Sequence, residues 1–147
     1  MAQNTSPIFP LVPKTTWVSG TPTNAATPGC TANTTKDLTS GTIYGPIFTA
    51  DATDGSRLDF IKMRALGTNN GTVVRVWLNN GSVTTTAANN ALYLERAISS
   101  TTVSESLEQP DLVLPLNISL PPSYRVYVTF GTVVAAGFHV TGVGGDY

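Results

Sequence analysis

The chain has 147 residues and a formal net charge of −1, and charged residues make up 12% of it, which is about half the usual share. This length suits one domain with an extension. Such a weakly charged surface argues against nucleic-acid binding and a polybasic membrane contact, both of which need clustered Lys and Arg, and favours association with other proteins.

Residues 1–40 differ in composition from the rest of the chain. They carry five prolines among Thr, Asn, Ser and Ala, with no helical period and little strand alternation. Such a segment cannot bury enough apolar surface to fold alone, so we expect an extended, partly polyproline coil. We place the boundary between this N-terminal arm and a domain over residues 41–147 at Ser40, and we expect a neighbouring chain to hold the arm.

The apolar residues near the N-terminus form a short run that prolines interrupt, which does not fit a signal peptide. No apolar run in the chain approaches the roughly 18 residues that a membrane span needs. We therefore expect neither a secretion signal nor a membrane segment.

From residue 42 onward the sequence is typical of β-structure. Thr, Val, Ile, Tyr and Phe dominate, and Gly or Pro interrupts the pattern about every ten residues. Pro46 predicts an edge strand or a bulge, and the apolar phase changes at Phe60-Ile61, which predicts a β-bulge. The expected strands, in chain order, are residues 42–49, 57–66, 72–78, 91–98, 112–120, 124–130 and 138–143.

Two segments leave an alternative open. Residues 91–96 fit a short helix as well as a strand, and we favour the strand because of its neighbours. Residues 99–109 are polar and could hold one helical turn. The chain is thus expected to be all-β, a single β-sandwich or jelly roll of about seven to eight antiparallel strands. The in-phase apolar residues predict a core that contains Leu58, Val74, Val76, Leu78, Val126, Val128 and Phe130.

Residues able to do chemistry are few and scattered. His139 is the only histidine and no Gly-x-Ser-x-Gly motif is present, so we expect an outward-facing strand histidine rather than a general base. Cys30 is the only cysteine, and one thiol makes neither an intrachain disulfide nor a cysteine-rich zinc site. Asp51, Asp54 and Asp59 lack the closing Glu of a calcium loop and predict an Asx turn. We expect no catalytic residues, no cofactor and no bound metal.

Aromatic residues give the best candidates for binding. Trp17 lies in the arm, where leaving it in water would be unfavourable, and with Phe9 and Leu11 it is a candidate anchor into a partner. Trp77 belongs either to a second layer of the core or, with Tyr127, to an exposed sheet face that contacts a sugar or a protein.

Three segments carry a family resemblance: Thr72–Gly81 (TVVRVWLNNG), Leu116–Tyr124 with its LPPSY turn, and Gly137–Tyr147 (GFHVTGVGGDY). Together they resemble small virion proteins of tailed bacteriophages and their prophages, over roughly residues 42–147. The resemblance implies a structural virion component, first of all a capsid decoration (cement) protein that bridges capsid subunits, and it carries over no catalytic residues. The implied partners are the major capsid protein or other virion subunits, with assembly as a homotrimer or homodimer in the host cytoplasm.

Two other functions remain open from the sequence. One is a different virion part, such as a tail, adaptor or head-fibre subunit, which copy number per particle would distinguish. The other is a carbohydrate-binding module or a glycan-acting enzyme. Trp77, Tyr93 and Tyr127 exposed in a line on one sheet face would favour sugar binding, and two facing carboxylates in a cleft would favour an enzyme.

Overall fold

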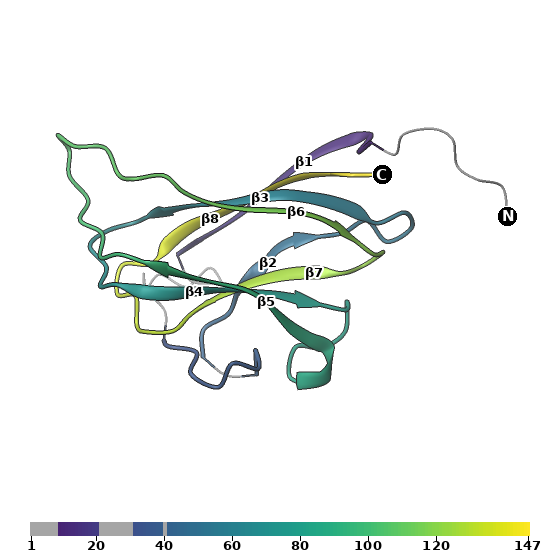
Figure 1. The fold of residues 1–147 in the computed structure, drawn as a ribbon, viewed down its shortest axis with the longest axis horizontal. Helices are drawn as coiled ribbons and strands as arrows, with labels where there is room; N and C mark the ends of the chain where they lie inside the picture. The colour runs from purple at the N-terminus through teal and green to yellow at the C-terminus, as the bar shows by residue number, and fades with distance from the viewer. Residues whose placement is uncertain (1–8, 21–30, 40) are drawn as a thin grey trace, which may run out of the picture.

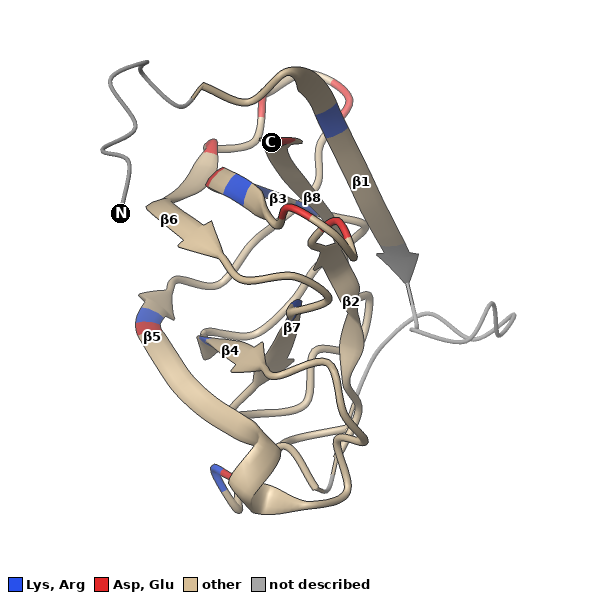
Figure 2. Ribbon diagram, turned by 90° about the vertical axis from the view of Figure 1, so that its right-hand side faces the viewer, with Lys and Arg blue, Asp and Glu red and all other residues tan. Residues whose placement is uncertain are grey.

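The computed structural model describes residues 9–20, 31–39 and 41–147, and this part of the chain is all-β apart from one short 3₁₀ turn, η1 (Ala87–Asn89). Eight antiparallel strands form two sheets of four, as Figures 1 and 2 show from two sides. The strands are β1 (Val12–Gly20), β2 (Tyr44–Thr49), β3 (Ser56–Ala65), β4 (Thr72–Asn79), β5 (Asn90–Ile98), β6 (Leu112–Leu120), β7 (Arg125–Phe130) and β8 (Phe138–Asp146).

The strand order identifies the architecture. The first sheet runs β1-β8-β3-β6 and the second runs β2-β7-β4-β5. The chain crosses from one sheet to the other at every connection except the one between β4 and β5. This order of eight antiparallel strands in two facing sheets is that of a jelly roll, which confirms the predicted fold class.

Most predicted strands are confirmed, and so are two local irregularities. The register of β3 shifts between Leu58 and Phe60 against both of its neighbours, next to the predicted bulge. Pro46 lies in β2, an edge strand whose register against β7 is also irregular. Of the two open alternatives, residues 91–96 belong to strand β5, and residues 99–109 contain no helix.

The prediction of a coil throughout the arm is wrong for Val12–Gly20. These residues form β1, which pairs with β8 from Val12 opposite Asp146 to Gly20 opposite Phe138. Pro13, the one proline of β1, is tolerated because β1 is an edge strand, where one side of the backbone needs no ladder partner. The predicted boundary at Ser40 lies outside the described residues.

The core lies between the two sheets and contains the predicted residues. Leu58, Val74, Val76, Val126, Val128 and Phe130 are buried there, and Leu78 packs against them partly buried. Aromatic rings fill one end, where Phe130 meets Tyr44 edge-on at 5.4 Å and stacks with Phe138 at 5.1 Å between ring centroids. These side chains supply the apolar burial that holds the sheets together.

We predict that Val76→Ala lowers the free energy of unfolding by about 1–3 kcal/mol, because it leaves a cavity between the sheets. Denaturant unfolding measures the change. The matched control is Val83→Ala, whose exposed side chain lies in a loop, and which should change stability by less than about 0.5 kcal/mol. Equal effects of the two substitutions would contradict this assignment of the core.

Candidate functional site: the outer face of the first sheet and its edge strand

The predicted arm anchors are exposed on β1 and just before it. Phe9, Leu11 and Trp17 expose 69%, 81% and 70% of their surface. Large apolar side chains that a chain leaves in water, gathered along one sheet edge, are typical of a contact with another molecule. Their role in binding a partner stays a prediction.

The alternating direction of side chains along β1 explains why Trp17 faces outward. Lys14 points toward the second sheet, where its Nζ donates to the carbonyl of Thr49 at 2.7 Å and lies 3.0 Å from Asp146 Oδ1. The Thr16 hydroxyl donates to the carbonyl of Ile47 in β2. Because successive side chains of a strand point to opposite faces, Trp17 stands on the outer face of the first sheet.

Cross-strand register extends this outer face across all four strands. One row runs from Trp17 through Thr141 and Lys62 to Val113. The next row runs from Thr15 through Val143 and Phe60 to Pro115. Phe60 and Val143 are half-buried and Val113 and Pro115 are exposed, so the face has an apolar centre.

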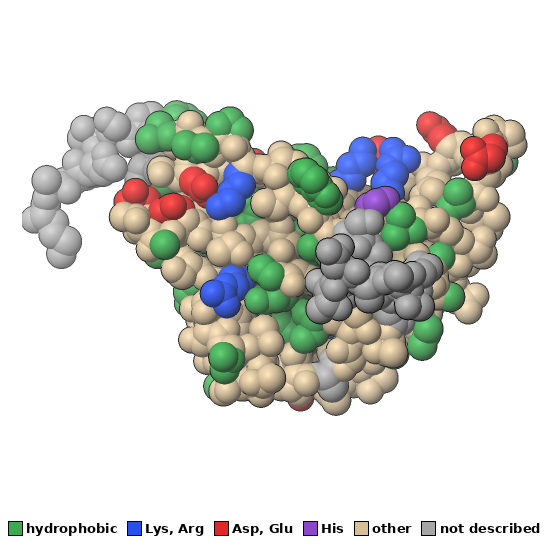
Figure 3. All heavy atoms as spheres, turned by 180° about the vertical axis from the view of Figure 1, so that it is seen from behind, with side chains coloured by type: hydrophobic (Ala, Val, Ile, Leu, Met, Phe, Trp, Pro, Cys, Tyr) green, Lys and Arg blue, Asp and Glu red, His purple; other side chains and the backbone are tan. Residues whose placement is uncertain are grey.

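The charged groups beside this centre are mostly paired. Asp111 Oδ2 lies 3.0 Å from Lys62 Nζ, and Arg64 binds the other carboxylate oxygen. The hydrogen bond from Lys62, aided by the charge of Arg64, lowers the pKa of Asp111 below its usual value. His139 is exposed and opposite Arg64 in the ladder, and Figure 3 shows this histidine beside Lys and Arg side chains. This end of the face therefore carries basic side chains, two of which share the carboxylate of Asp111.

The outer face of the second sheet is covered over β4 and β7, which overturns the predicted exposed-face contact at Trp77 and Tyr127. These side chains are 1% and 7% exposed, opposite each other in β4 and β7, and they form a small second core with Leu38 and Ile43. The Trp77 indole donates to the Thr129 hydroxyl at 2.9 Å. The aromatic platform that would have favoured sugar binding is thus occupied by the chain itself.

Polar contacts hold the covering segment, residues 31–39 and 41–43, in place. The backbone N–H of Asn33 donates to the carbonyl of Phe130 at 2.8 Å, and Arg75 Nη1 donates to the carbonyl of Asn33 at 2.6 Å. Arg75 Nε also donates to Glu95 at 2.6 Å, and Lys36 lies 3.5 Å from the same carboxylate. The hydrogen bond from Arg75 is the main reason that the pKa of Glu95 is lowered.

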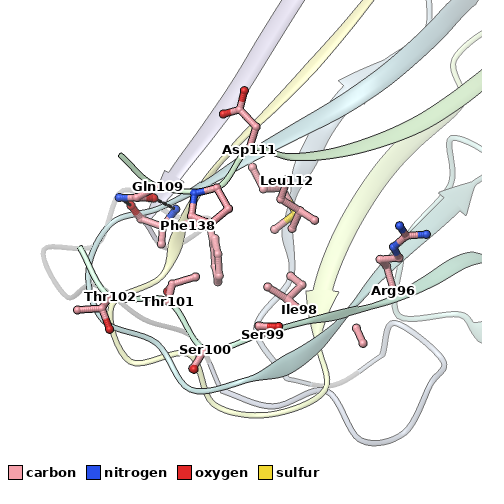
Figure 4. Close-up of a pocket in the computed structure, with 14 residues that line it drawn as sticks. Arg96, Ile98, Ser99, Ser100, Thr101, Thr102, Gln109, Asp111, Leu112 and Phe138 are labelled. Carbon is pink, nitrogen blue, oxygen red and sulfur yellow. Dashed lines mark hydrogen bonds between the residues drawn. The ribbon is translucent and has the colours of Figure 1, made fainter. Parts of the chain in front are cut away.

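A cavity of about 360 Å³ opens where β5 and β6 diverge at the edge of the sandwich (Figure 4). Met63, Ile98, Leu112 and Phe138 line it on the apolar side, and its polar lining includes the hydroxyl side chains of residues 99–102 together with Arg96 and Gln109. The only carboxylate among its lining residues is that of Asp111, which points away from the cavity and is bound to Lys62 and Arg64. The lining therefore offers no acid–base pair.

Asp51 and Gly144 have structural roles. The carboxylate of Asp51 accepts the backbone N–H groups of Thr53 and Asp54 at 2.7 and 3.0 Å, which confirms the Asx turn and lowers the pKa of Asp51. Gly144 packs so closely on the carbonyl of Arg57 that a side chain at this position would clash. Cys30 lies outside the described residues.

Within residues 9–20, 31–39 and 41–147, no group of three or more His, Cys, Asp or Glu side chains is placed to hold a metal ion. The same part of the chain has no helix long and apolar enough to cross a membrane. The chain matches no protein-family model, no curated protein and no solved structure at a significant level.

Sequence reasoning identified Phe9, Leu11 and Trp17 as candidate anchors but missed the sheet face that Trp17 belongs to. Trp17 was identified by its composition alone, whereas Phe60, Val113 and Val143 join it only through the β1–β8–β3–β6 pairing. The alternation of Leu116, Ile118 and Leu120 with polar residues in β6 was the available signal, because the same phase continued back along the strand gives it an outward side bearing Val113 and Pro115.

We predict that Leu38→Ala loosens the cover over Trp77, because the small second core loses its central aliphatic side chain. Acrylamide quenching of tryptophan fluorescence, measured in a Trp17→Phe background so that only Trp77 emits, should increase. The unfolding free energy should fall by roughly 2–5 kcal/mol if the cover and the body unfold together. Leu107→Ala, at an exposed loop position, is the control, and unchanged quenching in the Leu38 variant would contradict the assigned packing.

We also predict an acid-sensitive contribution from Glu95. Since its folded-state pKa is below the ordinary value of 4.5, its stabilisation is complete above that pH and is lost as pH falls through the folded-state pKa. Glu95→Gln should therefore flatten the decrease of unfolding free energy below pH 4.5. Glu108→Gln, at an exposed position, serves as the control, and identical pH profiles for wild type and Glu95→Gln would refute the prediction.

Proposed function

We propose that this protein is a structural component of a tailed-phage virion, of the capsid decoration type, and that it docks through the outer face of the first sheet and β1. The observation that carries the proposal is Trp17, a large aromatic side chain that is 70% exposed in a cross-strand row leading to the apolar centre of the face. Aromatic side chains at the centre of a contact supply much of the binding energy of protein interfaces.

The contrast between the two sheets supports this choice of surface. The chain covers Trp77 and Tyr127 of the second sheet with Leu38 and Ile43, whereas Trp17 on the first sheet is 70% exposed. Because monomeric proteins keep exposed apolar patches small, the exposed side chains of the first sheet indicate a surface that a partner covers.

The sequence resemblance to small virion proteins supplies the class of partner. Jelly rolls occur in viral capsid domains and also in lectins, so the fold alone does not choose between them. The burial of Trp77 and Tyr127 removes the aromatic row that would have favoured a sugar ligand. We therefore place the protein with the virion components, and copy number per particle distinguishes a decoration protein from a tail or head-fibre subunit.

The function requires no reaction. Docking across a seam between capsid subunits buries apolar surface of both partners, and the bound protein stabilises the closed shell by mass action. Lys62 and Arg64 already share Asp111, so little unpaired charge has to be desolvated at the margin of the contact.

We predict that Trp17→Ala weakens binding to undecorated particles by at least about tenfold, because it removes the central aromatic anchor. Occupancy measured against free protein concentration gives the affinity. Tyr93→Ala is the matched control, since Tyr93 is also an exposed aromatic side chain but lies on β5 in the other sheet. His139→Ala should bind nearly normally. Loss of binding in the His139 variant, together with normal binding of the Trp17 variant, would overturn the proposal that the protein docks through Trp17 and carries out no reaction.

A further inference from the structure

The buried core of the jelly roll is complete without β1. The side chains of β1 are described from Val12 to Val18, and none of them belongs to the buried core; only Val18 packs against it, partly buried. β2, β3, β4, β6, β7 and β8 supply the buried core, together with a few residues of the loops, and β5 adds the partly buried Leu94 and Ile98. β1 is thus attached to a body whose hydrophobic interior does not depend on it.

Backbone and polar contacts attach β1. Its ladder with β8 runs along the whole strand, and Lys14 is held between Asp146 and the carbonyl of Thr49. The hydroxyl of Thr16 adds a bond to the carbonyl of Ile47. The ladder would accept β1 from any copy of the chain, and Lys14 would fix the same register.

The chain length between β1 and the rest of the molecule permits another copy to supply the strand. Ten residues, 21–30, separate β1 from the next described segment, and ten residues span at most about 33–36 Å. A domain of about 100 residues has a radius of gyration of about 13 Å. The connection is therefore long enough to reach the equivalent edge of an adjacent copy.

We propose that β1 is exchanged between copies of this chain, so that β1 of one copy completes the first sheet of the next by pairing with its β8. Exchange of an identical element is a route to closed dimers or rings that forms no new type of contact. The strand leaves without opening the core, regains the same ladder and the same Lys14–Asp146 ion pair, and places its Trp17 on the outer face of the neighbouring copy. This linkage is a property of the chain alone and does not depend on the virion function.

Coexpression of two single-cysteine chains tests the exchange. One chain carries Thr15→Cys and the other carries Val143→Cys and a larger tag, and both carry Cys30→Ser. Thr15 and Val143 are opposite each other in the β1–β8 ladder, at a separation that suits a disulfide. We expect a disulfide-linked heterodimer on a non-reducing gel, because only a strand supplied by another copy brings these two positions together.

The control uses two positions that no exchange of β1 can join between copies. Lys62 and Thr141 are opposite each other in β3 and β8, both within the body, so chains carrying Lys62→Cys and Thr141→Cys should remain unlinked. Heterodimers in this control as well would mean random collision and would overturn the inference.

A third variant and the unmodified protein complete the test. If one chain carrying both Thr15→Cys and Val143→Cys closes its disulfide as a monomer while the coexpressed pair stays unlinked, β1 is not exchanged. Light scattering of the wild-type protein is independent of any substitution. A mass of at least two chains of 15.4 kDa is expected, and a mass of one chain would overturn the proposal.

Discussion

Burial of the alternate apolar side chains of β3, β4, β7 and β8 is the constraint on which the rest of the structure depends. Each of these strands places one set of side chains between the sheets, and most of the charged residues lie on the outer faces or in the loops; Lys14 and Asp146, which pair with each other, are the exception among the strands. Since 12% of the residues are charged, the two outer faces cannot both be well solvated by charge. Apolar side chains therefore remain on both outer faces, and something other than charged neighbours has to accommodate them.

The apolar side chains of the two outer faces are accommodated differently. On the second sheet, Leu38 and Ile43 cover Trp77 and Tyr127, and Arg75 ties the covering segment to the sheet through the carbonyl of Asn33. On the first sheet, the aromatic residue comes from β1 and stays in water. The same composition thus produces a self-covered face and an open one, and the open one is the surface that we assign to a partner.

Asp146 connects this open face to the interior of the fold. It accepts hydrogen bonds from the Ser56 hydroxyl in β3 and from Lys14 in β1, so one carboxylate near the end of the chain joins three strands. This junction orients β1 through a charge rather than through the core. An edge strand held in this way has a defined register while its large apolar side chains remain available for contact.

The sequence by itself determined the class of fold, most strand positions and the core. Alternation in residues 72–78 and 124–130 fixes which side chains face inward, because the period of a strand is two and apolar burial selects one face. It also indicated Trp17 as a candidate anchor, since an aromatic residue in a polar segment has no local place to be buried.

Tertiary structure alone decided what covers each outer face and where the arm lies. β1 lacks an apolar alternation because its inward residues include Lys14 and Thr16, which bond to Asp146 and Ile47 far along the chain. The sequence left open whether Trp77 is buried or exposed, because its cover, Leu38, is 39 residues away in sequence and comes from a segment with no strand pattern of its own. Local periodicity records which face a side chain points to, whereas burial depends on contacts between distant segments that only the folded chain brings together.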